Sequence, residues 1–136
     1  MKIVRFKDLK YTPASHENFT NPGVWKKILL HKNDLSSGLV QMINWAKLPI
    51  GNLFAHHYHE DMEEIFVIIK GKTKITIGEE SAILQTGDTV VIPMGQVHAM
   101  KNIGKTVVYY LVVGISQGKG GKTINVIDKN PSGENF

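Results

Sequence analysis

Two stretches of the chain gather the residue types that bind transition metals. His57 and His59 stand two positions apart, Glu64 follows them, and His98 comes after a second glycine-rich stretch. Imidazole nitrogens combined with one carboxylate oxygen suit a divalent first-row ion such as Mn, Fe, Co, Ni or Zn. The sequence therefore predicts one such ion per chain, provided that the four side chains converge.

The expected local structure favours this convergence. Successive residues of a strand point to opposite faces, so His57 and His59 share a face while His56 points away. Glu64 opens the next apolar run after a short acidic turn, and an antiparallel hairpin would bring it opposite the histidine pair. The third histidine must arrive from a later strand.

Both stretches resemble the two signature motifs of the cupin superfamily. The first motif, G-x5-H-x-H-x(3,4)-E-x6-G, is matched by Gly51, His57, His59, Glu64 and Gly71, and the second, G-x5-P-x-G-x2-H-x3-N, by Gly87, Pro93, Gly95, His98 and Asn102. The x6 spacing selects Glu64 over Glu63, whose role as an acid or base at the pocket rim stays open. The resemblance implies a double-stranded β-helix, a jelly-roll barrel, with the metal held by His57, His59, Glu64 and His98.

Strand signals recur along the whole chain. Apolar or alternating runs at residues 24–31, 39–45, 65–69, 73–77, 81–84, 89–92, 107–113 and 123–127 are separated by turn residues. No segment has a helical period, and 136 residues suffice for one domain with a substantial core. We therefore expect an all-β protein of the double-sheet jelly-roll class, to which cupins belong.

Three parts of the chain are expected from its turn and glycine signals. Residues 1–23 form an N-terminal arm with an edge strand at 3–6, residues 24–116 form the cupin β-barrel, and residues 117–136 form a flexible C-terminal tail. An unpaired edge strand is a liability unless something covers it. We therefore predict a C2 homodimer in which strands of one subunit extend the sheet of the other, as in many small cupins.

Composition and charge exclude several classes of protein. The absence of cysteine excludes disulfides, thiolate metal sites and cysteine nucleophiles. The net charge is +4, but the lysines are scattered, which is typical of a solvated surface and not of a nucleic-acid site. The charged start and the lack of a membrane span predict a cytoplasmic protein without membrane or nucleic-acid partners.

Side chains that share a face with the ligands are expected to line a small-molecule pocket. The candidates are Phe54, Phe66, Ile68, Met100, Tyr109 and Met42. A plain barrel core accounts for them equally well. We expect His16 and His31 at the surface, and His56 in a structural or surface position and not as a ligand.

The resemblance implies several possible functions. The first is a metal-dependent enzyme for a small organic molecule, of dioxygenase, isomerase or decarboxylase type. The second is a metal-bound small-molecule binding or sensor module without catalysis, and the third is a structural cupin with a vestigial site. Fold alone does not choose among them, because one fold hosts many chemistries.

The residues argue against one of these functions, the decarboxylation of oxalate. Oxalate decarboxylases of the family place an arginine three residues before the first motif histidine, and that position is Phe54 here. The one arginine, Arg5, lies far away in the N-terminal arm. Oxalate chemistry is disfavoured, because the planar bidentate clamp for a carboxylate is missing. Three lysines are candidates to bind a phosphate, although the sequence does not place them: Lys26, Lys27 and Lys47.

Overall fold

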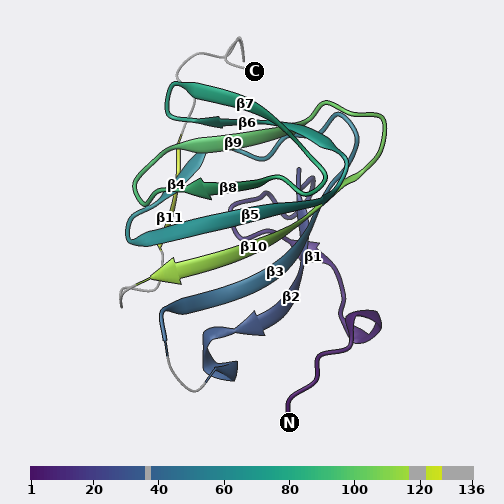
Figure 1. The fold of residues 1–136 in the computed structure, drawn as a ribbon, viewed down its shortest axis with the longest axis vertical. Coiled ribbons are helices and arrows are strands. Elements are labelled where there is room, and N and C mark those ends of the chain that lie inside the picture. The colour runs from purple at the N-terminus through teal and green to yellow at the C-terminus, as the bar shows by residue number, and fades with distance from the viewer. Residues whose placement is uncertain (36–37, 117–121, 127–136) are drawn as a thin grey trace.

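Two antiparallel sheets make up the protein (Figure 1). The computed structural model describes residues 1–35, 38–116 and 122–126. Sheet A has the spatial order β1 (Thr12–Pro13), β2 (Trp25–His31), β3 (Val40–Leu48), β10 (Val108–Ser116), β5 (Met62–Lys70) and β8 (Thr89–Ile92). Sheet B has the order β11 (Thr123–Asn125), β4 (His57–His59), β9 (His98–Asn102), β6 (Lys72–Ile77) and β7 (Glu80–Gln85). The all-β prediction is confirmed.

Helical structure in the described residues is limited to two short 3-10 turns, η1 (Phe6–Asp8) and η2 (Lys32–Asp34). None of the helices in this described part has the length and apolar character needed to cross a membrane.

The core lies between the two sheets. Burial alternates along β10 and along β5 as far as Ile68, so every second side chain points inward there. The most completely buried apolar side chains come from both sheets and include Leu48, Ile68, Ile75, Met100 and Val108. Removing this apolar area from water is the main driving force that closes the sheets on each other.

The N-terminal arm differs from the prediction. Residues 3–6 form no strand, and the arm contributes only the two residues of β1, which pair with Trp25 and Lys26 of β2. The ring of Phe6 instead packs edge-on against Trp45, with centroids 5.1 Å apart, and the Lys27 ammonium lies 3.8 Å from the Phe6 ring centroid. These contacts hold the arm against the outer face of sheet A.

The end of the chain is described only in part. β11 pairs antiparallel with β4, so a strand does form within the predicted range 123–127. Residues 117–121 and 127–136, on which the prediction of a flexible tail largely rests, lie outside the described residues. The division of the chain at residues 23/24 and 116/117 stays a prediction.

Candidate metal centre

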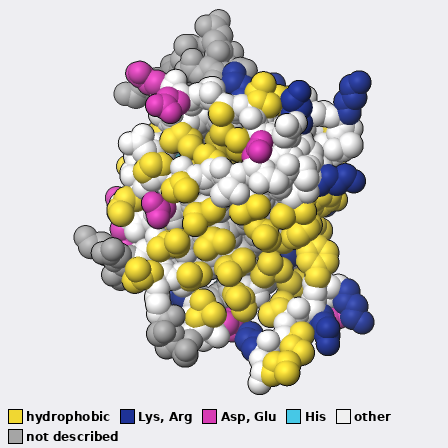
Figure 2. Space-filling view, viewed as in Figure 1, with side chains coloured by type: hydrophobic (Ala, Val, Ile, Leu, Met, Phe, Trp, Pro, Cys, Tyr) yellow, Lys and Arg dark blue, Asp and Glu magenta, His cyan; other side chains and the backbone are white. Residues whose placement is uncertain are grey.

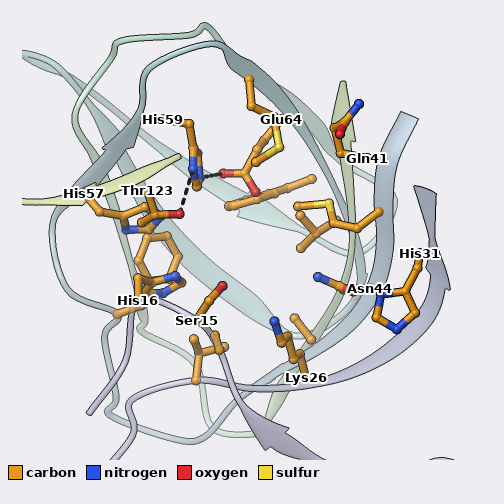
Figure 3. A pocket seen from close by; sticks show the side chains of 18 of the residues that line it. Ser15, His16, Lys26, His31, Gln41, Asn44, His57, His59, Glu64 and Thr123 are labelled. Atoms are coloured by element: carbon orange, nitrogen blue, oxygen red, sulfur yellow. Dashed lines mark hydrogen bonds and ion pairs between the residues drawn. The ribbon is translucent and has the colours of Figure 1, made fainter. Parts of the chain in front are cut away.

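The four side chains expected to bind a metal lie together inside the barrel. One ligand atom from each of His57, His59, Glu64 and His98 lies within 4.8 Å of every other, and all four residues are buried. Figure 3 shows His57, His59 and Glu64 turned toward one another at one wall of a cavity. Sequence spacing therefore predicted a cluster that the fold assembles.

The two sheets supply the cluster from opposite sides. His57 of β4 and His98 of β9 are direct partners in sheet B, whereas Glu64 stands on β5 in sheet A. The expected hairpin between the histidine pair and Glu64 is therefore wrong. The chain crosses from sheet B to sheet A between His59 and Met62, and Glu64 reaches the histidines across the interior of the barrel. Glu63 alternates to the outer side and is half-buried.

Hydrogen bonds fix how the histidines present their rings. The Nδ1 atoms of His57 and His98 donate to the carbonyl oxygens of Ala55 and Gln96, at 2.8 and 3.0 Å. Because a carbonyl only accepts, both rings carry a proton on Nδ1, which leaves Nε2 as the atom that each ring can offer to the cluster. This arrangement, in which outer partners orient the ligating imidazoles, is typical of metal sites in proteins.

The remaining contacts also fit a bound cation. His59 Nε2 lies 2.7 Å from Glu64 Oε1, and His98 Nε2 lies 3.3 Å from the same oxygen. Among the described residues, His98 Nε2 is nevertheless buried without a well-formed hydrogen bond. A buried polar nitrogen without a hydrogen-bond partner is costly in a protein interior. A divalent ion would satisfy it, so the residues fit the metal that the sequence predicts.

The electrostatics keep His57 and Glu64 in the protonation states that metal binding requires. Burial lowers the pKa of His57 to about 2, and the neighbouring His16 and His98 act in the same direction. Burial by itself raises the pKa of the Glu64 carboxyl, but His59 and His98 beside it outweigh this and hold the pKa below its ordinary value. At neutral pH the site offers a neutral His57 imidazole and an ionised carboxylate, as metal binding requires.

His16 is not the surface residue that the sequence predicted. Its ring stacks on His57 with a centroid distance of 3.9 Å and an interplanar angle of 16°. The arm returns over the barrel here, because Ala14 N–H donates to Val24 O and Glu17 accepts from Gly23 N–H. His16 therefore packs against a candidate ligand. His31 is exposed at the cavity rim, as expected, and His56 is half-buried, facing away from the cluster.

Thr123 of β11 completes the surroundings of His59. Its Oγ1 lies 3.1 Å from His59 Nδ1. We expect Thr123→Val to weaken metal binding by about tenfold, because outer partners of ligating histidines typically contribute that much. Calorimetric titration with Co²⁺ measures the change, and Thr12→Val, at an exposed residue of β1, is the matched control. Equal affinities in the two variants would show that other contacts orient His59.

A cavity of about 530 Å³ opens beside the four ligands. This volume is in the range of small-molecule sites. Its apolar walls include Phe54, Phe66 and Met42, as predicted, together with Tyr110 and Val112. Polar side chains also line it: Ser15, Lys26, Gln41 and Asn44, with Thr123 beside His59 (Figure 3).

Three predicted pocket residues lie elsewhere. Ile68 and Met100 point inward but belong to the packed core, outside the lining of the cavity. Tyr109 lies on the outer side of β10 against Trp45, with ring centroids 5.7 Å apart. The neighbouring Tyr110 points inward in its place, because burial along β10 falls on Val108, Tyr110 and Val112. An uninterrupted apolar run carries no alternation from which the inner face could be recognised.

Several lining residues were missed by sequence reasoning. The inner face of sheet A aligns Ala46 of β3 with Lys26 on one side and Tyr110 on the other. Asn44 lies two residues away on the same face of β3, and His16 arrives from the arm. The sequence did carry a signal for Asn44. Side chains alternate along residues 40–48, so Asn44 shares a face with Ala46 and Leu48, which are buried.

Fold and site together define a class of protein: a small jelly-roll barrel with a buried cluster of three histidines and one glutamate beside a ligand-sized cavity. A family model described as a cupin domain matches residues 44–114. A relative from Methanocaldococcus jannaschii, the uncharacterized protein MJ1618, is 33% identical over 104 residues, 76% of this chain and 79% of the relative. The chain belongs to the cupin family.

Solved structures agree with this assignment. A predicted oxalate decarboxylase from Thermotoga maritima superposes with a TM-score of 0.74 and 25% identity, covering 85% of this chain and 99% of that chain. The polyketide cyclase RemF from Streptomyces resistomycificus has a TM-score of 0.74 at 18% identity, over 96% of this chain and 89% of that chain. The second likeness shows the fold alone.

Proposed function

We propose that this cupin is a metal-dependent enzyme that acts on a small organic molecule, of dioxygenase, isomerase or decarboxylase type. The observation that carries the proposal is the opening of the His57, His59, Glu64 and His98 cluster onto a cavity of about 530 Å³. A divalent ion held there would supply Lewis-acid polarisation or activation of a bound water. The chain's own residues would orient the ligand rings and shield the bound molecule from bulk water.

The cavity lining supports a substrate other than oxalate. Phe54 is buried beside the cluster, with its ring centroid 5.3 Å from that of His57. Arg5 is not among the residues that line the cavity. Without a bidentate clamp a two-carbon dianion would be held poorly, whereas the apolar walls suit a molecule with a hydrocarbon body.

Elemental analysis of the untagged protein by mass spectrometry tests the proposal first. We expect about one Mn, Fe, Co, Ni or Zn per chain, lost in a His57→Ala/His59→Ala double variant and kept in a His31→Ala/His56→Ala control. The metal then selects the assay: oxygen uptake for iron, and isomerase and decarboxylase screens for zinc or manganese. Wild-type protein that takes up no metal after reconstitution would contradict the proposal. A metal with ligand binding but no turnover would favour the non-catalytic sensor module.

We further propose that the protein forms a homodimer through the outer side of sheet A. Figure 2 shows hydrophobic side chains gathered over β3, β10 and β5. This outer apolar face consists of Ile43, Trp45, Ile65, Val67, Ile69, Tyr109, Leu111 and Val113. Glu63 stands near one end of the face and Lys47 near the other. A two-fold axis that lies in this face and runs across the strands would bring opposite charges together, which supports a second copy as the occupant.

Light scattering coupled to size-exclusion chromatography tests the dimer by measuring its mass. Twice the chain mass of 15.2 kDa is expected for the wild type. Val67→Lys in the outer apolar face should give monomers, because a lysine ammonium would be buried without a partner. The control is Ile83→Lys on β7 of the other sheet, where the native side chain is 59% exposed. A monomeric wild type at micromolar concentration would refute the dimer.

A further inference from the structure

Lys26 carries a positive charge into the cavity from the strand opposite Glu64. It stands on the inner face of β2, paired with Ala46, and its side chain projects into the cavity (Figure 3). The other two lysines that the sequence singled out are occupied elsewhere. Lys27 donates to Phe6 O at 3.1 Å, and Lys47 lies 4.3 Å from the ring centroid of Tyr11.

The Lys26 ammonium has no ion pair or hydrogen bond to any residue in the described part of the chain. Burial alone lowers its pKa. The acids of the lining are already engaged: Glu64 contacts His59 and His98, and Asp34 at the rim accepts from Lys2 at 2.6 Å. Withdrawing an ammonium partly from water costs free energy unless an anion pairs with it.

The charge of the site points the same way. The one carboxylate of the cluster already contacts His59 and His98, so Lys26 adds a positive charge that no acid of the described lining offsets. A cavity with surplus charge of one sign attracts ligands of the other sign. A neutral ligand would leave this surplus uncompensated.

Asn44 supplies a second, independent observation. Its side chain lines the cavity and is only 7% exposed, yet its Oδ1 is buried without a hydrogen-bond partner among the described residues. Buried amides in proteins nearly always have partners. In Figure 3 Asn44 and Lys26 lie on the same side of the cavity, across from His59 and Glu64. Together they form a polar wall whose ammonium and amide groups are available to bind a ligand.

We propose that this cavity binds a small organic carboxylate, whose carboxylate group pairs with Lys26 and whose polar substituent contacts Asn44. The inference rests on the proposed function, because it names the substrate class of the same site. The ligand must be larger than two carbons, since β3 and β10 stand between Lys26 on β2 and Glu64 on β5. Phe66, Met42 and Val112 provide the apolar surface for its body.

A carboxylate suits the site better than a phosphate does. Phosphate sites in proteins use arginine forks, several cations or helix N-termini. Among the described lining residues there is no arginine, and the second lysine, Lys32, is exposed. One ammonium and one amide match a single negative charge.

The test measures whether a negative charge on the ligand raises its affinity and whether that gain depends on Lys26. Calorimetry compares matched pairs of a carboxylate and its neutral amide: phenylacetate and phenylacetamide, 3-phenylpropanoate and its amide, and hexanoate and hexanamide. Phenyl phosphate serves as the phosphate probe. Each is titrated into Co²⁺-loaded and metal-free wild type, Lys26→Met, and the control Lys47→Met. Methionine keeps the packing of the lysine stem, so we expect Lys26→Met to fold and to retain metal.

The expected result is that at least one carboxylate binds the wild type about tenfold or more tightly than its amide, as for a charge-assisted hydrogen bond. This preference should vanish in Lys26→Met and persist in Lys47→Met. Equal binding of acid and amide, a preference that survives Lys26→Met, or no carboxylate binding at millimolar concentration would overturn the inference. Tighter binding of phenyl phosphate than of every carboxylate would overturn the assignment to carboxylates. The metal-free titrations separate the two proposals, because they test Lys26 even if the wild type binds no metal.

Discussion

Replacing Glu64 by glutamine should lower the affinity for a divalent metal by more than about 100-fold, since even outer partners of metal ligands contribute 10- to 100-fold. The amide keeps the size of the side chain and a carbonyl oxygen near His59, so the fold is expected to survive. What it loses is the one negative charge of the cluster, which is the only anionic ligand that the four residues offer.

The neighbouring residue supplies the matched control. Glu63→Gln removes the same charge one position away, but its side chain faces the outside of the barrel. Calorimetric titration with Co²⁺ and the metal-dependent rise in Tm should both be lost in Glu64→Gln and preserved in Glu63→Gln. If the two variants bound Co²⁺ equally, the buried cluster would not be the metal site.

Replacing Asn102 by leucine should cost about 3 kcal/mol or more of unfolding free energy. The Asn102 side chain is buried and makes three hydrogen bonds: Nδ2 donates to Leu48 O at 3.0 Å and to Thr106 O at 2.9 Å, and Oδ1 accepts from Gly104 N–H at 2.9 Å. Leucine leaves these three backbone groups without partners, and each such group costs about 1–3 kcal/mol when buried. The bond to Leu48 also joins the end of β9 in sheet B to the end of β3 in sheet A.

Denaturant unfolding followed by fluorescence measures this loss. Asn52→Ala is the control, because Asn52 is half-buried and its Nδ2 makes a single bond, to Gly23 O. Its cost should be about 1 kcal/mol. Asn102→Asp should be no milder than leucine, since a carboxylate would face two carbonyl oxygens. A loss below about 1 kcal/mol for Asn102→Leu would mean that the carbonyls find other partners or water.

The spacing of residues in the two motifs predicted part of the structure directly. Position by position, the two motifs selected the four residues that cluster and the glycines at turns, and Gly51, Gly71, Gly87 and Gly95 do adopt positive φ. Glycine is the residue that takes up such a backbone at little cost. These features depend on local chemistry and on fixed chain separations, which the sequence records directly.

Two errors came from the arrangement of neighbouring strands. The short acidic link after His59 suggested a hairpin, yet β4 and β5 belong to different sheets. The N-terminal arm suggested an edge strand at residues 3–6, yet these residues form no strand and Phe6 packs on Trp45. In both cases a local segment had more than one compatible partner, and the burial of distant side chains decided between them.

The sequence by itself determined the all-β class and the four residues of the buried cluster, with Glu64 rather than Glu63 among them, because residue type and spacing fix them. Only the tertiary structure placed His16 on His57, turned Tyr110 inward in place of Tyr109, and brought Lys26 and Asn44 to the wall facing the metal ligands. The physical reason is that strand register and sheet closure bring together residues far apart in the chain. These are set by the packing of the whole barrel, which no local pattern encodes.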